Sequence, residues 1–302
     1  MVIINFKSMS IGESFMQKKS MESIMKYVFI FCASISIISI ILIFFFIFRG
    51  GVPFMIEEGI GNFIFGTVWR PTASNAQFGI LPMIVGSLVV TAGAIIIGVP
   101  IGVLTSIFMA FFCPPKLYKF AKPAINLMAA IPSIVYGFFA LQIFVPISRE
   151  LFGGTGMNII TASVLLGIMI LPTIIGLSES SLRAVPSSYY DASVGLGATH
   201  ERSVMSVVVP AANSGIFSGI ILGIGRAIGE TMAVILVTGN QPIIPDSLTD
   251  GVRTLTTNIV LEMGYASGRH REALIATAVV LFIFIIILNS IFMVIKSKGE
   301  KR

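Results

Sequence analysis

The chain has 302 residues, of which 55% are hydrophobic and only 11% are charged. Soluble domains carry about 25% charged residues, so this chain could not cover a water-exposed surface of the size its length requires. Disorder is excluded as well, because the apolar fraction is far above that of chains that fail to collapse. The composition therefore predicts an integral membrane protein.

The formal net charge is +6, which taken alone would allow a nucleic-acid partner. Membrane proteins, however, gather Lys and Arg in their cytoplasmic loops. We therefore expect the basic excess to set the topology in a lipid bilayer, and we expect no nucleic acid to bind.

Six apolar runs are long enough to be membrane-spanning helices. The first would extend about 33 Å as a helix, enough to cross the hydrocarbon core. Gly and Pro inside several runs favour a packed bundle, where neighbouring helices satisfy the freed backbone groups. The pattern predicts an all-α membrane protein with six transmembrane helices. The runs cover residues 27–48, 80–111, 123–147, 158–178, 206–238 and 273–295.

The distribution of Lys and Arg predicts the orientation. If both termini are cytoplasmic, thirteen basic residues lie on the cytoplasmic side and six on the opposite side, as the positive-inside rule requires. We expect a cytoplasmic tail at 1–26, the first transmembrane helix at 27–48, a core of five further helices at 80–295, and a cytoplasmic tail at 296–302.

Energy supply and substrate capture are not encoded in this chain. The two longest external segments, 49–79 and 239–272, are too short to form binding domains. The sequence has no Gly-Lys dipeptide, so a phosphate-binding Walker A loop is absent. Two cysteines and two histidines, far apart, predict no disulfide framework, metal site or cofactor. We place no catalytic residue and expect a transport protein rather than an enzyme.

The fifth run carries a pattern typical of close helix packing. Gly215, Gly219 and Gly223 recur every four residues, and Gly229 continues a second such series. Small residues at this spacing let two helix backbones approach closely in lipid. We assign these four glycines to helix packing.

Arg226 and Glu230 are the only charged residues inside the apolar runs. On a continuous helix they share a face of about 60° with Gly219 and Gly223. One interpretation is a structural ion pair that neutralises itself. The other is a water-filled pathway for an oxyanion, with Arg226 offering a fork of donors and Glu230 holding Arg226 or accepting a proton. Thr231, the next residue, completes the candidate pathway set.

The loop at 182–210 has the pattern of a short exposed helix. Ser188 stands three residues before Asp191, as in a capping box, and Gly195 to Gly197 would end the helix. Thr199 would then cap the helix that follows. Such a helix suits a groove on a partner, although an ordinary surface helix is the commoner explanation.

Asp191-Ala192-Ser193, followed by Gly197 and, nine residues later, by Val207-Val208-Val209-Pro210, has the spacing of the Glu-Ala-Ala loop of ABC importer permeases. The chain resembles the permease subunits of phosphate-specific ABC importers, and most closely the PstC type. Further similar segments span about residues 60 to 295: 69–71, 78–87, 130–137, 225–234, 253–256 and 268–274.

The resemblance implies a type I ABC importer permease (MetI-like) fold. It implies a PstA-like second permease subunit, two copies of a PstB-like ATP-binding subunit and an external PstS-like phosphate-binding protein as partners. It associates Arg226 and Glu230 with the phosphate pathway, and Asp191, Ala192, Ser193, Gly197 and Pro210 with coupling to the ATPase. A sulfate or molybdate permease stays open as an alternative. An ion-coupled secondary transporter is disfavoured because no inverted repeat is visible.

Overall fold

The computed structural model describes the backbone of residues 4–300 and the side chains of residue 22 and of residues 24–294. The chain divides into two units, Met1–Gly50 and Gly51–Arg302. Each unit is described by itself below.

The first unit is helical. Helix α1 (Ile4–Glu58) begins in it and contains the whole predicted span 27–48. Large apolar side chains such as Phe29, Ile41 and Phe46 are more than half exposed, because no other element of this unit covers them. A helix this apolar needs lipid or a partner subunit around it.

The second unit opens with an external hairpin that a short helix precedes. The strands pair antiparallel, with Trp69 opposite Phe78. Three apolar helical regions follow, and the third is α7. The elements are α2 (Ile60–Phe65), β1 (Trp69–Arg70), β2 (Gln77–Phe78), α3 (Leu81–Ile107), the π-helical turn η1 (Phe108–Phe112), α4 (Pro115–Ala130), α5 (Ser133–Gln142), α6 (Phe144–Phe152) and α7 (Ile159–Arg183).

The second half of this unit contains the loop after α7 and the last two apolar regions. Its elements are α8 (Ser187–Gly195), α9 (His200–Ser203), the π-helical turn η2 (Val204–Val208), α10 (Val209–Ala211), α11 (Asn213–Gly229), α12 (Met232–Val237), α13 (Leu255–Met263) and α14 (Gly268–Glu300).

Among the described residues, four single helices are long and apolar enough to cross a bilayer: Ile24–Glu58, Leu81–Phe112, Ile159–Arg183 and Gly268–Val294. Two bent pairs pass the same test. Pro115–Ala130 and Ser133–Gln142 meet at 98°, and His200–Ala211 and Asn213–Gly229 meet at 69°. Counting each pair as one span gives the six spans that hydropathy predicts.

The bend between α4 and α5 differs from the continuous run expected at 123–147, and Pro132 explains it. The residue before a proline is driven out of the helical region, and Ile131 is extended, with ψ 128°. The hydroxyl of Tyr136 donates to the carbonyl oxygen of Met128 at 2.8 Å. That hydrogen bond satisfies one carbonyl that the break leaves open.

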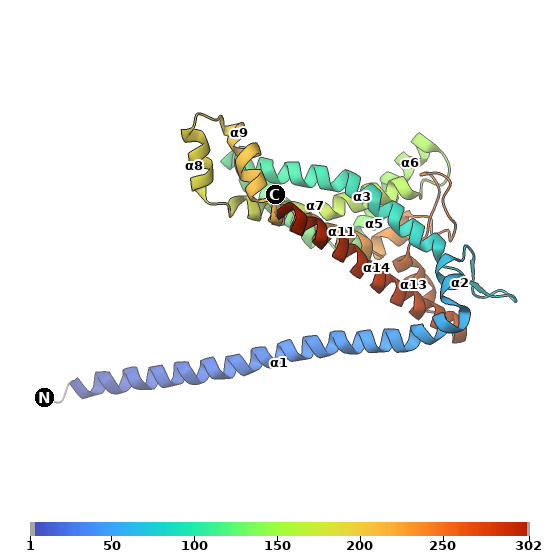
Figure 1. Ribbon diagram of the computed structural model, residues 1–302, viewed down its shortest axis with the longest axis horizontal. Coiled ribbons are helices and arrows are strands. Elements are labelled where there is room, and N and C mark those ends of the chain that lie inside the picture. Colours follow the sequence, from blue (N-terminus) through green and yellow to red (C-terminus); the bar gives the residue numbers. More distant parts are fainter. Residues whose placement is uncertain (1–3, 301–302) are drawn as a thin grey trace. The chain divides into compact units, whose positions relative to one another are not determined.

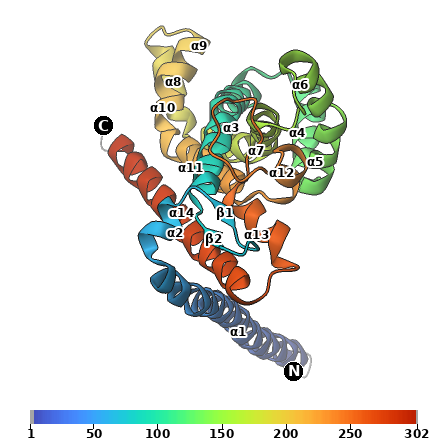
Figure 2. The ribbon, with the colours of Figure 1, turned by 90° about the vertical axis from the view of Figure 1, so that its right-hand side faces the viewer.

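The core of the second unit lies where α3, α7 and α11 pack along one another (Figure 2). Small residues make this possible: a side chain at Gly102 would lie 2.8 Å from Ile174, and so would one at Gly223. Ile174 itself is fully buried. The helices therefore associate through close backbone approach, as expected where lipid supplies no hydrophobic driving force.

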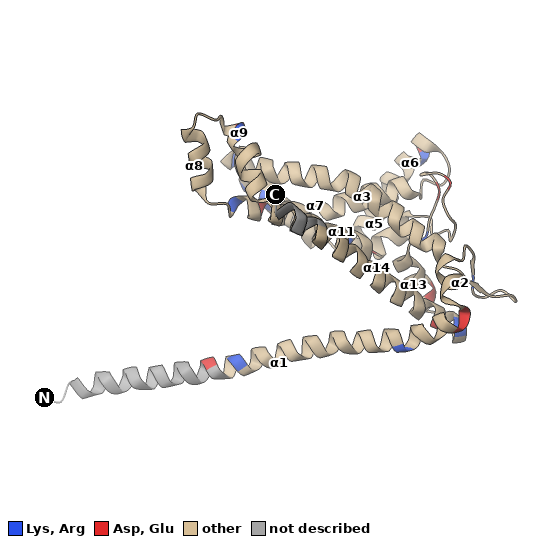
Figure 3. Cartoon of the chain, viewed as in Figure 1, with Lys and Arg blue, Asp and Glu red and all other residues tan. Residues whose placement is uncertain are grey.

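The second unit has two polar ends. Helices α8 and α9 lie at one end, and the β1–β2 hairpin and α13 lie at the other (Figure 1). Charged residues gather toward these ends, with long uncharged stretches of α3 and α14 between them (Figure 3). This is the distribution of a bundle that spans a membrane.

Candidate functional site

Arg226 lies in the last turn of α11 and is half-buried. Its guanidinium has neither an ion pair nor a hydrogen bond within the part of the chain that the structure describes. A cation in an apolar span with no carboxylate beside it is an electrostatic site for an anion.

Glu230 does not share a helical face with Arg226, because α11 ends at Gly229. Glu230 has an extended backbone, with ψ 132°. Its Oε1 accepts the backbone N–H of Thr231 at 3.2 Å and that of Ala233 at 3.3 Å. The expected continuous face is therefore wrong. The interpretation of Arg226 and Glu230 as a structural ion pair is wrong as well, because the two side chains form no ion pair among the described residues.

The break after Gly229 has a physical cause. It leaves the first amides of α12 without helical partners, and the Glu230 carboxylate supplies an acceptor for them. The hydroxyl of Thr256 donates to the Glu230 carbonyl oxygen at 3.1 Å, and that of Thr231 to the Gly229 carbonyl at 3.2 Å. In the sequence, this break is indicated by Gly229 followed by Glu230 and Thr231, whose side chains can form hydrogen bonds with backbone groups that lack a helical partner.

Two broken helices meet at this place. Helix α12 packs on α5, and a side chain at Gly137 of α5 would lie 2.8 Å from the Cα atom of Ala233. The Oε2 atom of Glu230 makes no hydrogen bond within the described residues. The site thus combines an unpaired guanidinium with a free carboxylate oxygen, which suits an anion that also carries a hydroxyl group.

The predicted packing glycines fall into two groups. Side chains at Gly215, Gly219 and Gly223 would meet α7, at distances of 2.0, 3.1 and 2.8 Å from its nearest atoms. Gly229 has nothing within 4 Å inside the described part of the chain, so it makes no helix contact there. Gly229 belongs to the break, not to the α7 interface.

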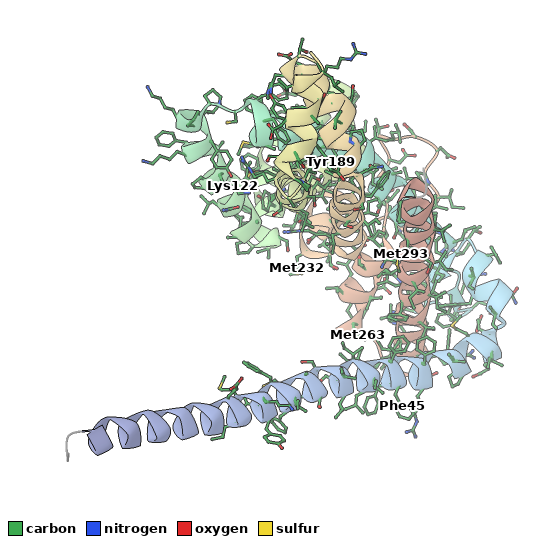
Figure 4. The ribbon with its side chains drawn as sticks, turned by 60° about the vertical axis from the view of Figure 1, so that its left-hand side comes forward. Phe45, Lys122, Tyr189, Met232, Met263 and Met293 are labelled. Carbon is green, nitrogen blue, oxygen red and sulfur yellow. The ribbon has the colours of Figure 1, made fainter. Side chains whose placement is uncertain are left out.

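The predicted docking helix is α8, and none of its residues is buried. Asp191 and Ala192 are exposed. Gly197 follows the helix with φ 88° and an open surrounding, a conformation that other residues rarely adopt. Figure 4 shows Tyr189 on this helix at the same end of the unit as Lys122 of α4. Leu196 beside it is 90% exposed.

The capping of this loop differs from expectation at one end. Helix α8 begins at Ser187 after Pro186 with no side-chain cap, so the capping box expected at Ser188 and Asp191 is not formed. A proline before the first turn already fixes the chain direction there. Thr199 caps α9 as predicted, by accepting the N–H of Arg202 at 3.4 Å.

Specific contacts tie the loop back to the bundle. The hydroxyl of Tyr190 donates to His200 Nδ1 at 2.8 Å, and His200 Nε2 donates to the carbonyl oxygen of Phe111 in η1 at 3.3 Å. Ser203 and Ser193 join the two arms of the loop through their hydroxyls at 3.0 Å. Pro210 lies exposed in α10. The loop is held as a unit, with its outer face open.

Glu179 is a functional candidate that sequence reasoning missed. It lies one residue beyond the predicted span 158–178, and its side chain is only 2% exposed. It accepts from Lys122 Nζ at 2.6 Å, the Tyr118 hydroxyl at 2.7 Å and Arg183 Nε at 3.0 Å. Arg183 follows Glu179 by four residues, the spacing of an ion pair on one helix face, and this spacing could have indicated the site in the sequence.

A second missed cluster lies at the opposite end, around Glu262 of α13. Its Oε1 accepts from Arg253 at 2.6 Å, and its Oε2 accepts from the Trp69 indole at 2.9 Å and from His270 Nε2 at 2.8 Å. A cavity of about 350 Å³ opens beside it. The four residues come from β1, α13, α14 and the segment before α13, so no local pattern could have linked them.

Metal binding finds no support among the described residues, where no three His, Cys, Asp or Glu side chains come together. Cys32 and Cys113 are free thiols.

A bundle of broken membrane helices, an open loop helix at one end and an unpaired cation inside together define the membrane subunit of a transport system. The chain belongs to the family of binding-protein-dependent transport system inner membrane components, whose model matches residues 102–299. It is therefore a multi-pass ABC importer permease, a transport subunit that works with other subunits.

Individual relatives support this assignment. The probable ABC transporter permease protein YqgH of Bacillus subtilis (strain 168) is 35% identical over 273 residues, which cover 88% of each chain. The phosphate transport system permease protein PstC of Pasteurella multocida (strain Pm70) is 34% identical over 261 residues, which cover 80% of this chain and 81% of the relative.

Solved structures agree in fold. A chain of the MetNI methionine ABC transporter in an inward-facing conformation aligns with a TM-score of 0.54 and 21% identity, over 73% of this chain and 94% of that one. This likeness confirms the predicted all-α importer-permease fold.

Proposed function

We propose that this chain is the membrane-spanning permease subunit of an ATP-driven phosphate importer, and that it forms part of the path by which inorganic phosphate reaches the cytoplasm. The PstC permeases among its relatives are named for phosphate transport. Phosphate as the substrate is inferred from these relatives, and the pathway is inferred from the chain's own residues.

The observation that carries the proposal is the unpaired guanidinium of Arg226. An arginine without a carboxylate partner keeps its fork of donors free for a planar pair of oxyanion oxygens. Its position at the end of α11, beside the break at Glu230, places it in an apolar span where a cation is costly without a counterion. A passing anion supplies that counterion.

Glu230 supports phosphate over sulfate. Near neutral pH phosphate still carries at least one hydroxyl, whereas sulfate carries none. The free Oε2 of Glu230 accepts a hydrogen bond from such a hydroxyl and repels an anion that has none. Thr231 adds a hydroxyl at the same break. The pair Arg226 and Glu230 thus selects a protonated oxyanion.

The partners follow from what this chain lacks. A PstA-like permease would complete the pathway, two PstB-like subunits would hydrolyse ATP, and an external PstS-like protein would deliver phosphate. Helix α8 with Gly197 and Leu196 is the proposed ATPase dock, because its outer face is uncovered. The distribution of Lys and Arg supports an orientation with α8 and both termini in the cytoplasm and Glu262 on the outer side.

Uptake of radiolabelled phosphate into proteoliposomes that contain the assembled complex tests the proposal. We expect ATP-dependent uptake that excess sulfate does not block. Arg226→Ala should abolish uptake while the complex still assembles. Arg149→Ala, at an exposed position of α6, is the matched control and should transport normally. Near-normal uptake by Arg226→Ala would refute the pathway role, and sulfate or molybdate uptake in place of phosphate would refute the substrate.

A further inference from the structure

Helix α4 is held in an unusual way. None of its side chains is buried, so no hydrophobic core fixes its position within the chain. Within the described residues, Tyr118 and Lys122 of α4 donate to Glu179 of α7. Near the other end of α4, the backbone carbonyl of Met128 accepts from the Tyr136 hydroxyl of α5. Apart from its packing along α7, helix α4 is therefore attached to its neighbours by polar contacts at two points.

The first attachment point leads to the docking loop. Arg183, which pairs with Glu179, also donates to the carbonyl oxygen of Met109 at 2.8 Å. The carbonyl of Phe111, two residues on in the same π-helical turn, accepts from His200 at 3.3 Å. His200 in turn holds Tyr190 of α8. The carbonyls of η1 thus accept hydrogen bonds both from the docking loop and from Arg183 of the Glu179 cluster. Such π-helical turns often lie at functional sites.

The second attachment point leads to the transport site. Met128 lies six positions after Lys122, a rise of about 9 Å along the helix. The Met128 carbonyl accepts from Tyr136 of α5. The next residue, Gly137, lies against Ala233 of α12, and the Glu230 carboxylate accepts the N–H of Ala233. A displacement of α4 therefore moves the helix that packs against the break beside Arg226.

We propose that Glu179 is a positioning residue that transmits movement of the docking loop to the Arg226 site, through α4. The inference rests on the proposed transport function. Three donors from two helices share one buried carboxylate, two of them on α4 and one, Arg183, on α7. Movement of η1 that displaces Arg183 shifts the same carboxylate that holds Tyr118 and Lys122. Glu179 acts through Tyr136 and has no contact with the transported anion.

The experiment compares the assembled complex with Glu179→Gln and with wild type, in a background that carries Cys32→Ser and Cys113→Ser. Spin labels at Leu127 of α4 and Leu104 of α3, both exposed, report the distance between these helices with and without ATP. We expect an ATP-dependent shift in wild type that Glu179→Gln loses, and a fall of about tenfold in phosphate taken up per ATP hydrolysed. Glu150→Gln, exposed on α6, should behave as wild type.

A purely structural role would lower the yield of complex but leave uptake per ATP unchanged in what assembles, and that result would overturn the proposal. If Glu179→Gln does not assemble, Lys122→Met with Tyr118→Phe takes its place, because Arg183 still neutralises Glu179. Wild-type coupling in that double variant overturns the proposal too. Lys122→Arg with Tyr118 intact should restore coupling.

The label measurement also separates this proposal from the transport function itself. If phosphate is not the substrate, phosphate uptake is absent from wild type, yet the ATP-dependent shift of α4 persists and still depends on Glu179. If the shift is absent from wild type, the route through α4 is wrong, whatever the substrate.

Discussion

The carboxylate of Glu230 accepts the backbone N–H of Ala233 at 3.3 Å and thereby caps the first turn of α12. This contact leaves Arg226 without a counterion among the described residues. The break thus separates the two charges that a continuous helix would pair. Capping uses Oε1 of Glu230, and the proposed substrate contact uses Oε2, so mutation can test the two roles separately.

Glu230→Gln should keep the cap and weaken transport. The amide oxygen of Gln still accepts the Thr231 and Ala233 amides, so the complex should assemble with an unchanged melting temperature. Loss of a hydrogen bond to a charged group costs about 1.5–3 kcal/mol, so phosphate uptake should fall about tenfold or more. Uptake into proteoliposomes measures this loss.

Glu230→Ala is the comparison. It removes the cap as well, so it should lower stability by about 1 kcal/mol in addition to the loss of uptake. Normal uptake in Glu230→Gln, or equal stability of the Gln and Ala variants, would contradict the division of roles between the two oxygens.

Leu196→Asp should release the ATP-binding subunit. Leu196 is 90% exposed beside α8, so the substitution costs this chain no packing. A charge placed in a docking groove removes apolar contact, and loss of such an anchor typically costs about 2 kcal/mol or more, or roughly thirtyfold in affinity. Co-purification of the ATPase subunit with the membrane complex measures it.

Leu151→Asp provides the control for this prediction. Leu151 is also exposed, but it lies in α6, far along the chain from the docking loop. It should retain the ATPase subunit. Full retention in Leu196→Asp would show that the docking surface lies elsewhere.

Gly215→Ala should destabilise the bundle where α11 crosses α7. The added methyl group would lie 2.0 Å from the Ser181 hydroxyl oxygen and 2.3 Å from its Cβ atom, so a helix must shift. Overpacking of this kind costs about 1–3 kcal/mol, and the complex should melt at a lower temperature.

Gly176→Ala tests whether glycine loss alone has this effect. Gly176 lies in α7, and a side chain there meets nothing within 4 Å. This variant should melt at or slightly above the wild-type temperature, because Ala favours the helix by about 1 kcal/mol. A drop equal to that of Gly215→Ala would mean that close approach is not the cause.

The sequence predicts the membrane class, the number of spans and the packing role of Gly215, Gly219 and Gly223, because these depend on composition and on local periodicity. Helix α8 and its end at Gly195 are local as well. The break at Glu230 escaped periodicity because an apolar run can hide a change of direction when a side chain replaces the missing backbone partners.

The clusters at Glu179 and Glu262 could not be found from local pattern. Glu179 joins Lys122, 57 residues away along the chain, and Glu262 joins Trp69, 193 residues away. Only the packing of α4 on α7 and of the hairpin on α13 creates them. Arg183 and Arg253 suggested basic loops in the sequence, yet each neutralises a buried carboxylate.

Glu262→Ala should lower the melting temperature of the complex far more than Trp69→Phe does. Glu262 is 9% exposed in its side chain and Arg253 is 15% exposed, so removing the carboxylate leaves a nearly buried cation without its counterion. Such a loss costs about 3–5 kcal/mol, whereas Trp69→Phe removes one hydrogen bond to a charged acceptor, about 1.5–3 kcal/mol.

Glu57→Ala is the control, because it removes a carboxylate that also faces an arginine. Glu57 lies 3.5 Å from Arg269, but its side chain is 66% exposed, and exposed pairs contribute about 0–1 kcal/mol. Melting temperatures should therefore fall in the order Glu57→Ala, Trp69→Phe, Glu262→Ala, from the smallest loss to the largest. ATPase retention should stay normal in all three, since α8 lies at the other end of the unit (Figure 1). An unchanged melting temperature in Glu262→Ala would show that the cluster does not stabilise the complex. Loss of the ATPase subunit in any of the three variants would show that the Glu262 end and the α8 end of the unit are coupled.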